Sequence, residues 1–278
     1  MDATEFRRAS LTTWDGLATG WDSWHSTIDR VFAPVNDWLL RGLAARRGET
    51  ILELAAGPGE VGFVAAAQLG PDGRLLSTDF SPRMVEVARR RGTERGLTNV
   101  DYRVMDAEKI DLEDGSVDAV LCCFGYMLMA DAAAALRETR RVLRPGGRAV
   151  FSVWAPIERN PWAGVTARVL KERGHIPPPP PGAADPFGMG DPDRTRALLE
   201  SVGFSRVHTE EVPVCFGAED VDQFLSLMRD SAPFGRALCS ISAGETDAIN
   251  AELGRAFAPF AGEAGYALPG VALATVAS

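Results

Sequence analysis

Apolar and polar positions alternate in a regular order from about residue 48 onward. Short apolar runs lie at 50–55, 73–79, 99–106, 117–125 and 147–155. They are apolar on both faces, which is typical of parallel strands buried between helices. The segments between them have the 3.6-residue periodicity of helices, so strands and crossover helices alternate along the chain. We therefore predict an α/β fold with a doubly wound, mostly parallel sheet.

The flanking segments complete this fold. Before the sheet, residues 12–47 predict two tryptophan-rich helices, and after residue 155 the pattern loosens around a proline run at 177–182. Two more strands are expected beyond residue 204, which makes seven. We divide the chain into an N-terminal helical cap (1–47), a Rossmann-like core (48–155), an inserted lid (156–190) and a C-terminal completion of the sheet with inserted helices (191–278).

The stretch ILELAAGPGEVG (51–62) carries the clearest chemical signal. Gly57, Gly59 and Gly62 have the G-x-G-x-x-G spacing of a nucleotide-binding turn between a strand and a helix. Asp79 ends the next strand, roughly 20 residues later, where an acidic residue binds ribose hydroxyls in such folds. The turn therefore predicts a ligand with a nucleoside.

Two residues of this turn separate the possible ligands. Glu53 would place a carboxylate near a dianionic pyrophosphate, and Pro58 removes a backbone N–H from a cradle of N–H donors. Both features disfavour the dinucleotide of an NAD(P)-dependent oxidoreductase, which stays open as the alternative. They favour S-adenosylmethionine, whose ammonium and sulfonium groups are attracted by a carboxylate.

With these motifs the sequence resembles the class I S-adenosylmethionine-dependent methyltransferases, in the branch of the ubiquinone and menaquinone biosynthesis methyltransferases. The resemblance covers about residues 12–215. It rests on ILELAAGPGEVG, on LLSTDFSPRMVEVARRR after it, and on ALRETRRVLRPGGRAVFSVW at the fifth strand. It implies S-adenosyl-L-methionine as cofactor and S-adenosyl-L-homocysteine as product.

The resemblance also implies a set of cofactor contacts. Gly57 and Gly59 would let the cofactor approach the backbone, and Asp79 would bind the ribose. The other implied positions are Glu53 and Ala55 in the turn, Phe80 and Met84 beside the adenine, Asp106 and the Ala107 N–H at its amino group, and the backbone near Cys123 at the ammonium.

The chain departs from the family pattern at two positions. Ala55 stands where the family has glycine, and an alanine is tolerated there if its φ is negative. Trp21 stands where relatives often carry a tyrosine. A tyrosine hydroxyl contact is therefore not expected.

Candidates for the chemistry of transfer are fewer. A base is needed only if the acceptor must lose a proton, as a phenol or an activated carbon must. His25 and Tyr126 are the candidates, although a packing histidine and a pocket-wall tyrosine are the ordinary alternatives. Trp21, Trp24, Trp154 and Trp162 would form the substrate pocket, which predicts a small apolar or aromatic acceptor methylated at oxygen or carbon.

Composition excludes several other classes of protein. The net charge of −9 disfavours nucleic-acid binding, which relies on clustered Lys and Arg. The four cysteines form no C-x-x-C pattern, so we expect no disulfide framework, no metal site and a reducing cytoplasm. No apolar stretch is long enough for a membrane span, and we expect a monomer or homodimer. A protein that binds the cofactor without transferring the methyl group is the remaining alternative.

Overall fold

Strands form where the apolar runs predict them. The computed structural model describes residues 3–176, 184–239 and 241–278, so the proline run lies outside the described residues. The strands are β1 (Thr50–Glu53), β2 (Arg74–Asp79), β3 (Val100–Val104), β4 (Val117–Cys123), β5 (Leu143–Trp154), β6 (Val207–Ala218), β7 (Ala261–Gly262) and β8 (Gly265–Ala277).

One sheet contains these strands in the order β3-β2-β1-β4-β5-β8-β6. The pairs among β1 to β5 are parallel, whereas β8 lies antiparallel between β5 and β6. This path has the seven strands predicted, and the two-residue β7 pairs with β8 as an addition. The mostly parallel, Rossmann-like sheet is thus confirmed.

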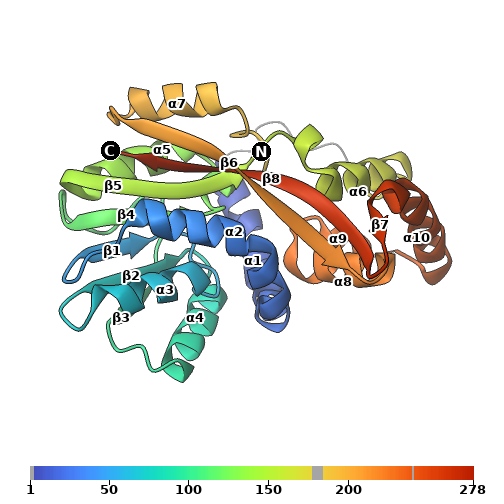
Figure 1. The fold of residues 1–278 in the computed structure, drawn as a ribbon, viewed down its shortest axis with the longest axis horizontal. Coiled ribbons are helices and arrows are strands. Elements are labelled where there is room, and N and C mark those ends of the chain that lie inside the picture. Colours follow the sequence, from blue (N-terminus) through green and yellow to red (C-terminus); the bar gives the residue numbers. More distant parts are fainter. Residues whose placement is uncertain (1–2, 177–183, 240) are drawn as a thin grey trace.

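Helices flank the sheet (Figure 1). They are α1 (Ala3–Ser23), α2 (His25–Leu43), α3 (Glu60–Leu69), α4 (Pro82–Glu94), α5 (Ala132–Val142), α6 (Pro161–Glu172), α7 (Pro192–Ser201), α8 (Val221–Ser231), α9 (Gly235–Cys239) and α10 (Ala243–Phe257). Short 3-10 turns cover Tyr126–Leu128, Ile157–Arg159 and Ala258–Phe260.

Helix α2 packs on the sheet through one apolar stripe. Its buried residues Ile28, Val31, Val35, Leu39 and Leu43 recur every three or four positions, and this stripe packs on β5, β6 and β8. The helix ends at Ala44, which is left-handed with φ 42°. Its first turns, including Ile28 and Val31 of this stripe, lie at the end of the sheet where ligands bind in such folds.

The long strands β6 and β8 extend beyond the core of the sheet. β6 and β8 pair from Val207 opposite Ala277 to Ala218 opposite Tyr266. Helices α8, α9 and α10 gather at their far end beside α6 (Figure 1). Helix α8 packs against α1, which closes the space between this extension and the core.

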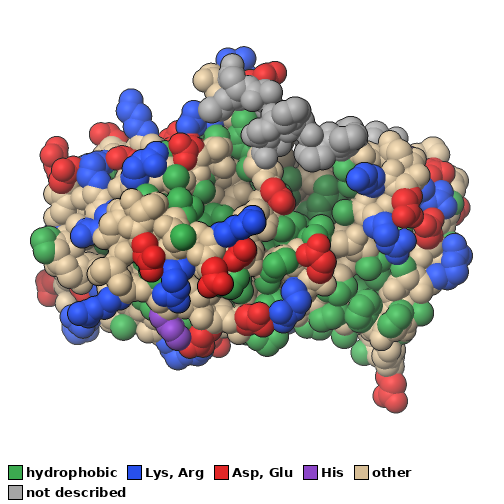
Figure 2. Space-filling view, turned by 90° about the horizontal axis from the view of Figure 1, so that it is seen from above, with side chains coloured by type: hydrophobic (Ala, Val, Ile, Leu, Met, Phe, Trp, Pro, Cys, Tyr) green, Lys and Arg blue, Asp and Glu red, His purple; other side chains and the backbone are tan. Residues whose placement is uncertain are grey.

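The surface carries both charges side by side. Figure 2 shows Lys and Arg interspersed with Asp and Glu on one face, around a hollow lined by hydrophobic side chains. No helix in the described parts of the chain is long and apolar enough to cross a membrane.

Candidate active site

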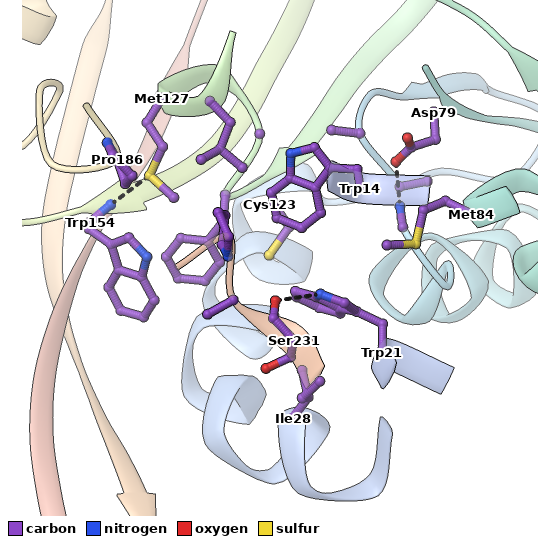
Figure 3. A pocket seen from close by; sticks show the side chains of 18 of the residues that line it. Trp14, Trp21, Ile28, Asp79, Met84, Cys123, Met127, Trp154, Pro186 and Ser231 are labelled. Carbon is purple, nitrogen blue, oxygen red and sulfur yellow. Dashed lines mark hydrogen bonds between the residues drawn. The ribbon is translucent and has the colours of Figure 1, made fainter. Parts of the chain in front are cut away.

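A cavity of about 400 Å³ lies at the carboxyl ends of the central strands. Its walls come from the ends of β1, β2, β4 and β5 and from α1, α2, α6 and α8, which are far apart in the sequence. Figure 3 shows Asp79 and Met84 on one side of it and Trp154, Met127 and Pro186 on the other. We call these sides the nucleoside end and the aromatic end.

The turn after β1 adopts the conformation that its glycines permit. Gly57 has φ 52° and lines the cavity, with open space where a Cβ would lie. Gly59 has φ 92° and does not line the cavity; a Cβ there would come within 2.4 Å of the Phe63 ring. Gly57 can therefore meet a ligand, whereas Gly59 serves the packing of α3.

The backbone conformation of Ala55 differs from the negative φ expected from the sequence. Its φ is 50°, not negative, so an alanine occupies a conformation that favours glycine. An L-residue pays roughly 1–2 kcal/mol in this region. The strained residue lines the cavity next to Gly125, whose own Cβ would lie 2.7 Å from that of Ala55.

Asp79 connects the glycine turn to the start of α4 at the nucleoside end. Its carboxylate accepts hydrogen bonds from the Gly57 N–H at 3.0 Å and the Ser81 N–H at 2.9 Å, and it faces the cavity (Figure 3). Burial raises the pKa of Asp79 to about 6, although both N–H donors oppose the rise. Each carboxylate oxygen keeps a lone pair for a further donor.

Glu53 is buried at the end of β1. Its carboxylate accepts from the Gly62 N–H at 2.9 Å and from the Ser77 hydroxyl at 3.2 Å. Burial raises the pKa of Glu53 to about 8, despite these two hydrogen bonds. Because the unfolded chain ionises this acid at a lower pH, the protein without ligand loses stability as the pH rises from 4.5 towards 8.

The other predicted nucleoside contacts gather nearby. Phe80, Met84, Asp106 and Ala107 all line the cavity. Arg7 of α1 also lines it, pairs with Glu108, and lies with its Nε 3.8 Å from the Asp106 carboxylate. The sequence contained no signal for Arg7, because it comes from a helix about 100 residues away.

The middle of the cavity joins both ends. Cys123 lines it at the end of β4, and its thiol contacts the Asn36 side-chain oxygen at 3.7 Å. Burial raises the pKa of the Cys123 thiol to about 12, so this cysteine stays protonated. Asn36 comes from α2 and was not anticipated.

The aromatic end is a cluster of packed rings. Trp154 stacks on Phe124 with ring centroids 4.3 Å apart, and Trp162 lies 5.1 Å from Trp154. Phe32 and Phe216 extend the cluster, at 4.9 Å from Phe124 and 4.5 Å from Trp162. We call Phe32, Phe124, Trp154, Trp162 and Phe216 the ring cluster; all five line the cavity.

The two tryptophans of the N-terminal cap that were predicted for the substrate pocket, Trp21 and Trp24, differ in position. Trp21 lines the cavity, and its indole N–H donates to the Ser231 carbonyl at 2.8 Å (Figure 3). Trp24 does not line the cavity; its N–H donates to the Asp230 carboxylate at 2.9 Å. The structure therefore places Trp21 at the predicted pocket and uses Trp24 to join α1 and α2 to α8.

Known proteins match this chain in sequence. Residues 51–147 match the methyltransferase domain family. The ubiquinone/menaquinone biosynthesis C-methyltransferase UbiE of Cupriavidus taiwanensis is 36% identical over 197 residues, which are 64% of this chain and 71% of UbiE. The chain belongs to the class I S-adenosylmethionine-dependent methyltransferases. S-adenosylmethionine is accordingly its cofactor, and the oxidoreductase alternative is not favoured.

Other similarities are partial or concern the fold. The aklanonic acid methyltransferase DauC of a Streptomyces species is 35% identical over 147 residues, 51% of this chain and 66% of DauC. The arsenite methyltransferase of Halobacterium salinarum is 35% identical over 105 residues, which are only 27% of its length. The Haemonchus contortus phosphoethanolamine N-methyltransferase 2, solved with S-adenosylhomocysteine, has a TM-score of 0.57 at 15% identity, covering 92% of this chain and 57% of that one. At this identity the likeness shows the fold.

The two candidate bases of this methyltransferase lie in different surroundings. His25 lines the cavity, with Nδ1 2.7 Å from the Asp22 carbonyl. Because a carbonyl only accepts, Nδ1 carries the hydrogen, and Nε2 keeps a lone pair 3.1 Å from the Ser26 hydroxyl. Nε2 is therefore the acceptor in its contact with Ser26.

Tyr126 is a different case. It is fully buried, does not line the cavity, and its hydroxyl lies 2.7 Å from that of Thr139. Burial raises the pKa of Tyr126 well above its ordinary value. This placement argues against the predicted catalytic role, and we no longer consider Tyr126 a candidate base. Among the described residues, no group of three or more ligating side chains is arranged to hold a metal ion.

The raised pKa of Asp79 predicts a pH dependence. Binding of S-adenosylmethionine is expected to weaken as the pH falls through about 6, because a protonated carboxyl is a poorer acceptor for ribose hydroxyls and loses its attraction to the cation. Below this pKa the affinity should fall by up to about tenfold per pH unit. Calorimetry on both sides of the pKa measures this, and Asp79→Asn, neutral at every pH, should bind weakly without this dependence.

Proposed function

We propose that this methyltransferase transfers the methyl group to an oxygen or carbon atom of a small, apolar, aromatic acceptor. The observation that carries the proposal is the ring cluster, which forms one continuous cavity with the nucleoside end. Aromatic acceptors are held by stacked and edge-on rings at centroid separations of about 4.5–7 Å. A small hydrophobic molecule could thus lie beside the cofactor.

The charges around the cavity support this acceptor class. Charged side chains lie towards the nucleoside end and on the first turns of α2, among them Arg7, Asp29 and Asp79. The ring cluster contributes only carbon surface and two indole nitrogens. An ionic acceptor would lose its hydration there without gaining a counter-charge.

The relatives support the same proposal. One is named for carbon methylation in ubiquinone/menaquinone biosynthesis and another for aklanonic acid. We propose that this chain likewise acts on a small molecule. A lid at 156–190, a cytoplasmic location and a monomeric or homodimeric state stay predictions of the sequence.

We assign the cofactor contacts as follows. Asp79 would bind the ribose hydroxyls, and Phe80, Met84, Asp106 and Ala107 would enclose the adenine, because these residues line one end of the same cavity. The backbone near Cys123 would face the ammonium. The bound cofactor supplies an electrophilic methyl group to an in-line nucleophile.

His25 would complete the chemistry for acceptors that must lose a proton. His25 lines the cavity, and its Nε2 would act as the general base once the Ser26 hydroxyl, 3.1 Å away, gives up its hydrogen bond to this nitrogen. Packing of the acceptor against the ring cluster would exclude water and hold the nucleophile towards the donor, so that positioning supplies much of the acceleration. Amine or thiolate acceptors would need no base.

The test begins with calorimetric titration of S-adenosylmethionine and S-adenosylhomocysteine, with NAD and NADP as controls. We expect binding of the two sulfur nucleosides alone, followed by transfer of labelled methyl to members of a panel of phenols and hydroquinones. Binding of NAD would replace the assignment with the oxidoreductase alternative. Donor binding without transfer to any acceptor would support a protein that keeps the cofactor site but not the reaction.

A further inference from the structure

The ring cluster contains a hydrogen-bond donor that has no hydrogen-bond partner among the described residues. Trp154 is 6% exposed, and its backbone N–H contacts the Met127 sulfur at 3.3 Å. Within the described part of the chain, its indole N–H makes no hydrogen bond, whereas four other tryptophans donate theirs to oxygen: Trp21, Trp24, Trp38 and Trp162. A buried indole N–H usually has a partner.

This indole nitrogen faces the cavity. Among the described residues, the fully buried side-chain nitrogens and oxygens without a hydrogen-bond partner are Arg7 Nε, Glu60 Oε1, Arg91 Nε, Tyr102 Oη and Asn250 Oδ1. Trp154 Nε1 is not one of them, so the small exposed area of the side chain includes its nitrogen. Trp154 lines the cavity, and Figure 3 shows the nitrogen edge of its ring turned towards the cavity centre.

The surroundings decide which chemical group can accept this hydrogen bond. The neighbouring walls are Phe32, Phe124, Ile157, Trp162 and Phe216, none of which carries a charge. A carboxylate or phosphate would be buried there without a cation, at a cost of several kcal/mol. A cationic group has no lone pair to offer an N–H donor. A neutral oxygen on an otherwise apolar molecule fits both the donor and the walls.

We propose that Trp154 Nε1–H donates a hydrogen bond to a ring carbonyl oxygen of the acceptor and thereby selects ketone- or quinone-bearing aromatic molecules. This inference rests on the proposed function, since it needs an aromatic acceptor at the ring cluster. A site that pairs a substrate oxygen disfavours analogues without it, because its buried N–H is left unpaired. Trp154 is thus a specificity-determining residue.

The test compares two ligands that differ at a single position. The protein saturated with S-adenosylhomocysteine is titrated with 1-tetralone and with tetralin, whose carbonyl is replaced by a methylene. The readout is the ratio of the two dissociation constants. In the wild type we expect the ketone to bind at least as tightly as the hydrocarbon, although it gives up more hydration.

Two matched variants locate the donor. Trp154→Phe keeps a ring but removes the N–H, so the preference for the ketone should fall about tenfold or more. Trp162→Phe removes the same atoms from a neighbouring ring whose N–H already donates to Asn160 Oδ1 at 3.2 Å. It should leave the ratio unchanged. In the wild type, the Trp154 indole N–H resonance should move downfield with 1-tetralone and not with tetralin, which tests the contact without any substitution.

The possible outcomes test the carbonyl assignment and the aromatic acceptor separately. If both ligands bind and Trp154→Phe leaves the ratio unchanged, or if Trp162→Phe changes it equally, the carbonyl assignment is wrong and the aromatic acceptor stands. An indole resonance that responds alike to both ligands would also overturn the assignment. If neither ligand binds the wild type, the aromatic acceptor itself is wrong, and the inference is rejected with it.

Discussion

Replacing Asp79 with alanine is expected to weaken S-adenosylmethionine binding about tenfold or more, on the order of 1.4 kcal/mol or above. The carboxylate would lose its contact with the ribose, and the Gly57 and Ser81 N–H groups would lose their present acceptor. Since Gly57 belongs to the glycine turn and Ser81 is the N-cap of α4, both walls of the nucleoside end would relax. Loss of the ribose contact and relaxation of the two walls would both weaken S-adenosylmethionine binding.

Calorimetry of Asp79→Ala with S-adenosylmethionine measures this effect. Asp101→Ala is the control, because Asp101 lies on the neighbouring strand β3, pairs with Arg74 and Arg103 at the surface, and does not line the cavity. Exposed pairs of this kind contribute at most about 1 kcal/mol of stability. Unchanged affinity in Asp79→Ala, or an equal loss in Asp101→Ala, would contradict the ribose assignment.

Replacing Gly62 with alanine is expected to lower the free energy of unfolding by about 2–4 kcal/mol. At an ordinary helical position this change is stabilising, because alanine is the better helix former by about 1 kcal/mol. Here the added Cβ would lie 2.0 Å from Oε2 of the buried Glu53 carboxyl, which accepts the Gly62 N–H. The carboxyl must move, and its hydrogen bonds to Gly62 and Ser77 are lost or distorted.

Urea denaturation of the wild type and Gly62→Ala gives the difference directly. Gly244→Ala serves as the matched control, since Gly244 also lies in the first turns of a helix but has open space around its Cβ position. It should be neutral or stabilising by up to about 1 kcal/mol. A Gly62→Ala protein as stable as the wild type would show that Glu53 is not confined as described.

Local sequence pattern was sufficient for most secondary structure. The run at 117–125 contains β4 (Val117–Cys123), and the pattern at 160–174 contains α6 (Pro161–Glu172). Ser81 caps α4, with its hydroxyl accepting from the Met84 N–H, as its place before Pro82 predicts. These features depend on neighbours a few positions away, and those neighbours are visible in the sequence.

The nucleoside end was also largely predictable. Asp79 ends β2, Gly57 and Asp106 follow β1 and β3, and parallel strands bring their carboxyl ends to one edge of the sheet. Strand order therefore placed these residues together without knowledge of any side-chain contact. The conformation of Ala55 did not follow, because its positive φ is imposed by the turn as a whole.

The sequence by itself thus determined the sheet, the helices around it and the cofactor class, because these depend on periodicity, capping and strand-end residues. Only the tertiary structure decided the acceptor side. It brought Phe32 and Phe216 to Trp154 from segments far apart in the chain, and it turned Tyr126 and Trp24 away from the cavity. The direction of a side chain at such a site depends on how helices from both ends of the chain pack over the sheet, and no local pattern carries that information.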